Sequence, residues 1–100
     1  MASPAARLGD LTLHGSPLGP GPGCLNVQIG GMPAWRAVID THGCPLSSPN
    51  PHGIGAVTRG SATVLIGGQQ AARQGDQILE AGSPAPNAIA SGAFNVLIGG

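Results

Sequence analysis

The sequence predicts an all-β domain made of three similar units, and three observations lead to this prediction. A strand-like hexapeptide that ends in Gly-Gly occurs at residues 26–31, 63–68 and 95–100. Each copy follows a glycine at the same offset, namely Gly23, Gly60 and Gly92. Glycine takes 18 and proline 10 of the 100 positions, which leaves little room for helices. Because one such unit is too small to bury its own apolar face, the three must pack together.

Two further markers set the boundaries of the units. An Ala-x-Arg segment with a nearby aspartate opens each unit, at residues 5–10, 34–40 and 71–76. A corner of the form Gly-Ser-Pro or Gly-Cys-Pro follows, at residues 15–17, 43–45 and 82–84. We therefore divide a single domain, residues 1–100, into units of about 4–31, 33–68 and 70–100.

The hexapeptides alternate in the manner of a half-buried β-strand. The alternation predicts that six side chains line one interior: Val27, Ile29, Val64, Ile66, Val96 and Ile98. Leu65, Leu97 and Gln28 should face the other way. At most one short helical turn is expected, at residues 69–74. Three equivalent units can close around an axis, so we expect a pseudo-threefold, three-sided body.

Charge is scarce and mostly paired. The chain has four arginines, no lysine and four acidic residues, and six of these eight charges form three recurrent pairs: Arg7 with Asp10, Arg36 with Asp40, and Arg73 with Asp76. We interpret the pairs as structural. So few cations make nucleic-acid binding unexpected. No phosphate-binding or nucleophile motif and no catalytic pair of carboxylates occurs, so no enzymatic activity and no catalytic residue are predicted.

The chain shows no basic and apolar leader and no apolar stretch of about 20 residues, so neither a signal peptide nor a membrane anchor is expected. We therefore expect folding in the cytosol, where a structural disulfide is unusual and cysteines more often bind metal or pack.

Histidine and cysteine gather at or near the proline-containing corners. His14 precedes the first corner, His42 and Cys44 flank Gly43 at the second, and His52 follows in the next loop. Three imidazoles and one thiolate form a complete tetrahedral set for one structural Zn²⁺. If equivalent corners converge, these ligands meet from distant parts of the chain. The third unit has Ala81 at the matching place and is expected to supply no ligand.

Other interpretations of these residues remain open. The histidines could be exposed loop residues. Cys24 and Cys44 could form a disulfide, although Cys24 matches Ser61 and Ala93 in the repeat and is more simply a small packing residue. His42 and Cys44 could form a catalytic dyad, or the metal could belong to a small zinc hydrolase with an open coordination position.

The segments Pro4-Ala5-Ala6-Arg7 and Ala71-Ala72-Arg73, the three Gly-Gly strands and the histidine and cysteine corners together resemble the PAAR-repeat proteins over essentially the whole chain. The resemblance implies a small pointed β cone with zinc near its apex, and it places His14, His42, Cys44 and His52 at the matching ligand positions. The second unit departs from the pattern, with Trp35 where the other units have alanine.

The resemblance also implies a function. Members of the family cap and sharpen the trimeric VgrG-type β-helical spike of type VI secretion systems, aid membrane puncture and help to deliver effectors. The chain would then be a monomer bound to a homotrimer, assembled in the cytoplasm and moved out of the cell on secretion, with transient contact with the target-cell membrane. Alternatives are an adaptor that recruits a secreted effector to the spike, or the tip of a phage-like contractile tail. No effector domain is expected at either end.

Overall fold

The structure, a computed structural model, describes residues 2–44, 53–80 and 83–99. Every helix or strand assigned within these ranges is a strand, which confirms the all-β prediction. The strands are β1 (Ser3–Ala5), β2 (Pro20–Gly21), β3 (Cys24–Ile29), β4 (Met32–Ala34), β5 (Thr41–Cys44), β6 (Gly53–Val57), β7 (Leu65–Ile66), β8 (Gln69–Gln70), β9 (Gln77–Glu80), β10 (Ser83–Ala88) and β11 (Ala93–Ile98).

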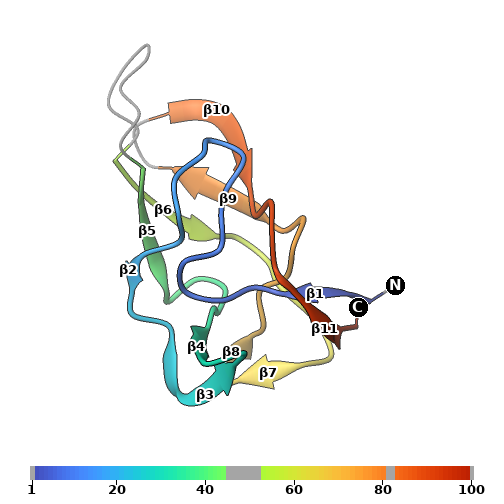
Figure 1. Cartoon of the computed structure of the whole chain (residues 1–100). Helices are drawn as coiled ribbons and strands as arrows, with labels where there is room; N and C mark the ends of the chain where they lie inside the picture. The colour runs from blue at the N-terminus through green and yellow to red at the C-terminus, as the bar shows by residue number, and fades with distance from the viewer. Residues whose placement is uncertain (1, 45–52, 81–82, 100) are drawn as a thin grey trace.

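The strands form one larger sheet and three small ones. The larger sheet has the order β10-β9-β6-β5-β2, and the small sheets pair β1 with β11, β3 with β4, and β7 with β8. All of these pairs are antiparallel. In Figure 1 the larger sheet occupies the upper part of the molecule and the three small sheets lie at its lower end. Each small sheet contains one of the glycine-ended hexapeptides, so the repeat marks one end of the molecule.

The three Ala-x-Arg segments join the units through a closed ring of hydrogen bonds. The Ala6 N–H donates to the Ala72 carbonyl, the Ala72 N–H to the Trp35 carbonyl, and the Trp35 N–H to the Ala6 carbonyl, each at 3.0 Å. Each unit therefore donates one bond and accepts one. The ring pairs segments far apart in sequence, so it forms only when all three units are in place.

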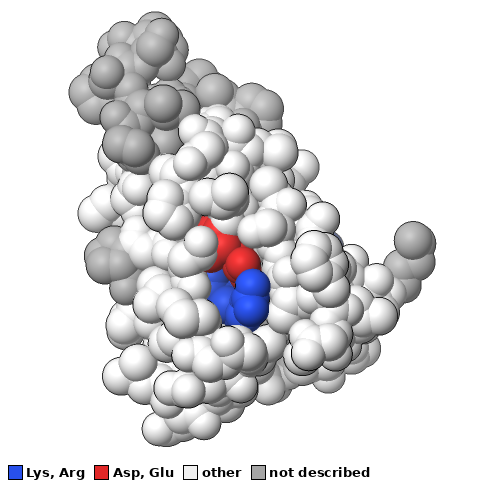
Figure 2. Space-filling model, in the orientation of Figure 1, with Lys and Arg blue, Asp and Glu red and all other residues white. Residues whose placement is uncertain are grey.

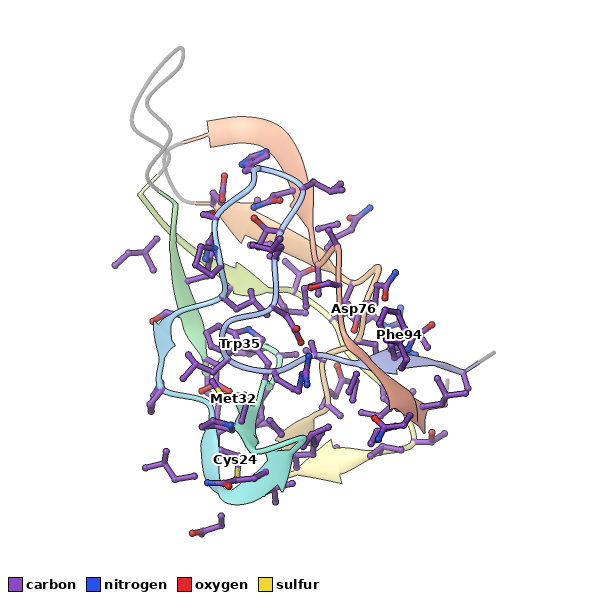
Figure 3. All side chains as sticks on the ribbon, in the orientation of Figure 1. Cys24, Met32, Trp35, Asp76 and Phe94 are labelled. Atoms are coloured by element: carbon purple, nitrogen blue, oxygen red, sulfur yellow. The ribbon has the colours of Figure 1, made fainter. Side chains whose placement is uncertain are left out.

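Two groups of buried side chains meet at this ring. The lower group consists of Ala5, Cys24, Ile29, Ala34, Ile66, Ala71, Ala93 and Ile98. The upper group consists of Ala6, Leu18, Trp35, Ala37, Val57, Ala72, Ile78 and Ile89. Adjacent alanines thus point to opposite sides of the ring, as Ala5 and Ala6 do. Trp35 is fully buried in the upper group, and Figure 3 shows it within the interior of the molecule.

The recurrent glycine before each hexapeptide has a steric role. A Cβ on Gly60 would lie 2.3 Å from the Ala71 carbonyl oxygen, and a Cβ on Gly92 would lie 2.8 Å from that of Ala5. A Cβ on Gly23 would lie 2.9 Å from the Pro33 side chain. A residue with a side chain cannot approach the ring so closely. These glycines let each hexapeptide strand start directly against the ring.

Most of the predicted interior is confirmed. Ile29, Ile66 and Ile98 are buried, and Val64 and Val96 pack against them while partly exposed. Val27 was predicted to be inside, but it is 37% exposed. The register of β3 against β4 changes between Cys24 and Gln28, as that of β11 against β1 does between Ala93 and Leu97, so the regular alternation that the prediction assumed is broken in both strands.

The helical turn expected at residues 69–74 is wrong. Gln69 and Gln70 form β8, which pairs with Leu65 and Ile66 of β7. Between them Gly67 and Gly68 adopt φ values of 59° and 81°, a conformation that suits a tight hairpin turn and favours glycine. The two glycines therefore reverse the chain before a helix can begin.

Candidate metal centre

Two of the predicted ligands lie on separate elements that the fold brings together. His42 belongs to β5 of the larger sheet, and His14 lies in a turn between β1 and β2. In that turn the Gly15 N–H donates to the Thr12 carbonyl at 2.9 Å, and the Thr12 N–H donates to the Ser16 carbonyl at 3.0 Å. The His14 N–H contacts Asn87 Oδ1 of β10 at 3.2 Å. The turn is thus fixed against the same sheet that carries His42.

The ring of His42 is almost completely buried, with 1% of the residue exposed. Its Nδ1 lies 3.2 Å from the Pro17 carbonyl oxygen, and its Nε2 lies 3.3 Å from Ser16 Oγ. Because a carbonyl oxygen only accepts hydrogen bonds, Nδ1 carries a proton and Nε2 holds the lone pair of the neutral ring. Burial lowers the pKa of His42 against the opposing effect of the Glu80 carboxylate. The neutral ring is the form that binds a metal ion.

A buried carboxylate stands between the two histidines. Glu80, at the end of β9, is 2% exposed. Its Oε1 lies 3.1 Å from His14 Nδ1, and its Oε2 lies 3.6 Å from His42 Nε2. Asn87 Nδ2 donates to Oε2 at 3.0 Å. All three repeat units therefore contribute a side chain here, since His14, His42 and Glu80 come from the first, second and third unit.

The other two predicted ligands are only partly accounted for. Cys44 ends β5 with its backbone opposite Gly53, and His52 lies outside the described residues. In the described part of the chain, no group of three or more His, Cys, Asp or Glu side chains could hold a metal ion as it stands. The neighbouring imidazoles of His14 and His42 suit zinc chemically, as a pair of nitrogen ligands. The four-ligand zinc site stays a prediction.

Two alternatives from the sequence are contradicted within the described part of the chain. Neither described histidine is an exposed loop residue, since the side chain of His14 is 12% exposed and that of His42 is 1% exposed. Cys24 is a buried free thiol, so it is not in a disulfide. It packs in the lower group of the core, as its place in the repeat predicted.

Glu80 is the residue that the sequence analysis missed. Aligning the units at the Gly-Ser-Pro corner places Ala81 opposite His14. In that alignment Glu80, one residue earlier, does not match a predicted ligand. Counting from the aspartate of the ion pair instead gives His14 four residues after Asp10 and Glu80 four residues after Asp76. Glu80 is also the only acidic residue outside the recurrent pairs. These two signals together could have found it.

The recurrent arginine and aspartate pairs are ion pairs, as predicted. Arg Nη2 lies 2.9 Å from Asp Oδ1 in the first unit, 2.9 Å in the second and 3.0 Å in the third. In each case the aspartate also accepts a bond from the backbone N–H of its arginine, at 2.8, 2.8 and 2.7 Å. The pairs close the turns next to the ring. On the face in Figure 2 the visible charges form one small group in an otherwise uncharged surface.

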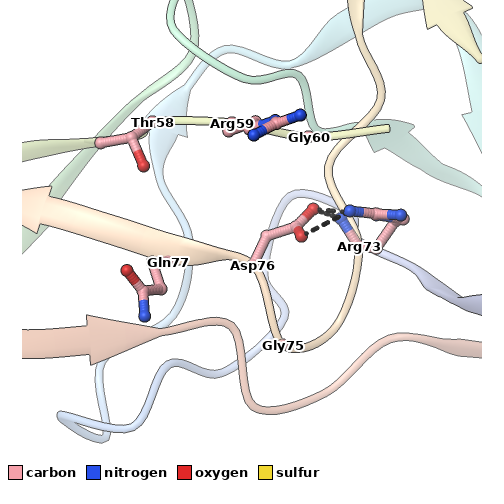
Figure 4. Close-up of a pocket in the computed structure, with 7 residues that line it drawn as sticks. All are labelled: Thr58, Arg59, Gly60, Arg73, Gly75, Asp76 and Gln77. Carbon is pink, nitrogen blue, oxygen red and sulfur yellow. Dashed lines mark hydrogen bonds and ion pairs between the residues drawn. The ribbon is translucent and has the colours of Figure 1, made fainter. Parts of the chain in front are cut away.

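A cavity of about 430 Å³ lies beside the third ion pair, lined by Thr58, Arg59, Gly60, Arg73, Gly75, Asp76 and Gln77. Figure 4 shows Arg59 across this cavity from the bonded Arg73 and Asp76. Arg73 is committed to Asp76 and to the Gly99 carbonyl. None of the cavity's lining residues is a predicted metal ligand, so the cavity is separate from the candidate metal centre.

Within the described residues, no helix is long and apolar enough to span a membrane.

A comparison with curated proteins gave no match. The family model described as the PAAR motif matches the chain twice, over residues 21–84 and residues 55–100. Together these matches cover the second and third units, the end of the first unit and most of the candidate metal centre. The chain therefore belongs to the PAAR motif family.

Proposed function

We propose that this protein is a structural spike tip that caps and sharpens the trimeric VgrG-type β-helical spike of a type VI secretion system. Membership of the PAAR motif family carries the proposal, because that family is associated with such spike tips. In this role the protein is assembled in the cytoplasm on the spike and leaves the cell with it, so that it aids puncture of the target membrane and delivery of an effector. It is not an enzyme.

The closed ring of hydrogen bonds supports a pseudo-threefold arrangement of the units. Three backbone bonds of equal length connect equivalent segments in a cycle. A monomer with such an axis can present three similar surfaces to the three subunits of a spike. A single chain can thereby match the threefold symmetry of the partner.

The docking surface that we propose is formed by the outward side chains of the hexapeptide strands. Leu65 of β7 is 62% exposed, Leu97 of β11 is 60% exposed, and Gln28 of β3 is exposed at the matching position. Apolar side chains in equivalent places suit contact with a repeated apolar surface. The three strands lie together at the lower end of the molecule (Figure 1), which leaves the candidate metal centre toward the opposite end.

We also propose one structural zinc ion near the apex, held by His14, His42, Cys44 and His52. A chain of 100 residues has a small core, and structural zinc adds on the order of 10 kcal/mol of apparent binding energy in small domains. The adjacent histidines support the proposal. Elemental analysis of the purified protein should give one zinc per chain, and a chain that is metal-free as purified would refute this part.

Co-purification with the spike trimer tests the docking proposal. Replacing Leu65 and Leu97 by glutamate should weaken the complex, because buried charges at the interface would lack partners. The matched control is Leu79→Glu, since Leu79 is 65% exposed but lies in β9 of the larger sheet. Equal loss of binding in both variants would contradict the assigned surface. Capture of an effector in the absence of the spike would favour the adaptor function instead.

A further inference from the structure

We infer that Glu80 is a positioning residue of the metal centre, whose buried carboxylate holds the ring of His14 in place and puts a negative charge beside the ring of His42. This inference rests on the proposed zinc site and deepens it, because Glu80 is not one of the four proposed ligands. It concerns the third repeat unit, which was expected to supply no ligand.

The contacts of the carboxylate divide between the two rings. Oε1 faces His14 Nδ1 at 3.1 Å, and Oε2 faces His42 Nε2 at 3.6 Å. Histidines that bind metals usually have their other ring nitrogen held by a carboxylate or a backbone carbonyl, which fixes the ring and its tautomer. In this site Glu80 is such a carboxylate for His14, and the Pro17 carbonyl does the same for His42.

The charge of Glu80 also favours a cation. The lone pair of His42 Nε2 and the Oε2 oxygen of Glu80 are both acceptors, and they lie 3.6 Å apart in a buried place. Two acceptors that face each other in a buried place repel. A divalent cation bound by the histidines would convert this repulsion into attraction. The side chain thus prepares the site electrostatically as well as sterically.

The fold makes room for this carboxylate. Glu80 pairs with Gly55 of β6 on one side and with Ser83 of β10 on the other. A Cβ on Gly55 would lie 2.9 Å from Glu80 Cγ, so the absence of a side chain at residue 55 allows the glutamate to fit. Asn87 then holds Oε2 through its amide at 3.0 Å. A side chain that fits beside Gly55 and is held by Asn87 can in turn position the ring of His14.

The test compares Glu80→Ala and Glu80→Gln with the wild-type chain, and Gln77→Ala serves as a control because Gln77 is an exposed residue of the same strand. Zinc affinity is measured by competition with a chelator, and the loaded site is probed by the absorption spectrum of Co²⁺. We expect Glu80→Ala to lower zinc affinity by about 10- to 100-fold. Glu80→Gln should lose less, since its one amide oxygen can still accept a hydrogen bond from the ring of His14, and Gln77→Ala should match the wild type.

The expected Co²⁺ spectrum is four-coordinate in all of these proteins, because a positioning residue is not itself a ligand. A changed coordination number in the Glu80 variants, or unchanged zinc affinity, would overturn the inference. Glu80→Gln preserves the volume of the side chain, so it keeps the test valid if Glu80→Ala does not fold. ¹⁵N NMR of the zinc-loaded proteins adds a specific readout: the ring signals of His14 should shift in Glu80→Gln. A wild-type chain without zinc would instead refute the zinc proposal.

Discussion

The second ion pair should contribute more to stability than the third, and replacement of its aspartate tests this. Asp40 is fully buried and accepts four hydrogen bonds. Three come from Arg36, at 2.8 to 2.9 Å, and the fourth comes from the Gly23 N–H of the first unit at 3.0 Å. Asn at this position has one acceptor oxygen and places an amide group against N–H donors. It would leave the guanidinium of Arg36, whose side chain is 15% exposed, without its anion.

We expect Asp40→Asn to lower the free energy of unfolding by about 3–5 kcal/mol, the usual cost of breaking a buried ion pair from one side. The matched variant is Asp76→Asn. Asp76 is 10% exposed, lines the cavity, and accepts three bonds from Arg73. Water can partly replace those bonds, so this variant should lose only about 1–3 kcal/mol. A small domain has about 5–15 kcal/mol in total, which makes the difference readily measurable.

Urea unfolding followed by circular dichroism gives both free energies by linear extrapolation. The titrations are run with zinc and with chelator, so that a change in metal binding is separated from a change in the ion pair. Equal losses in Asp40→Asn and Asp76→Asn would show that burial and the inter-unit bond to Gly23 do not set the strength of these pairs. A loss below about 1 kcal/mol in Asp40→Asn would show that the pair acts like an ordinary surface ion pair.

Three further predictions use the same unfolding measurement. Trp35→Ala should cost about 3–5 kcal/mol as a large core truncation, and Trp35→Phe less, because the indole N–H has no hydrogen-bond partner among the described atoms. Gly60→Ala should cost more than about 4 kcal/mol, since its Cβ would meet the Ala71 carbonyl at 2.3 Å, whereas Gly68→Ala meets no atom within 4 Å and should cost about 1–3 kcal/mol for its positive φ. Because the folded pKa of His42 is lowered from 6.5, the unfolded chain binds its proton more readily. The metal-free protein should therefore lose stability as pH falls below about 6.5, and His42→Gln should reduce that loss.

The sequence predicted those features of the fold that recur in each unit. A single Val-x-Ile segment is weak evidence for a strand, but three copies with the same flanking glycines are strong evidence. The burial of Ile29, Ile66 and Ile98 and the three ion pairs followed from this recurrence. Each feature is local, because the residues involved are close in sequence or occupy the same place in their units.

The features that the sequence did not predict depend on pairing between distant segments. The change of register of β3 against β4, beside which Val27 is exposed, is an example, because the sequence does not show the register of pairing. Glu80 comes close to His42 only because β6 joins β9 to β5 in one sheet. The sequence around Glu80 does not indicate that His42 lies beside it in the fold.

The two ends of the molecule differ in how strictly they repeat, and the proposed function accounts for this difference. Three similar strands lie at the lower end, and a surface that meets three identical subunits needs such similarity. His14, His42 and Glu80 meet in the upper part and differ from unit to unit, as expected of the proposed metal centre, where ligands and supporting residues surround one point and perform different tasks. The ring formed by Ala6, Trp35 and Ala72 lies between the two groups of core residues. It lets the upper part depart from the repeat without disturbing the strands below.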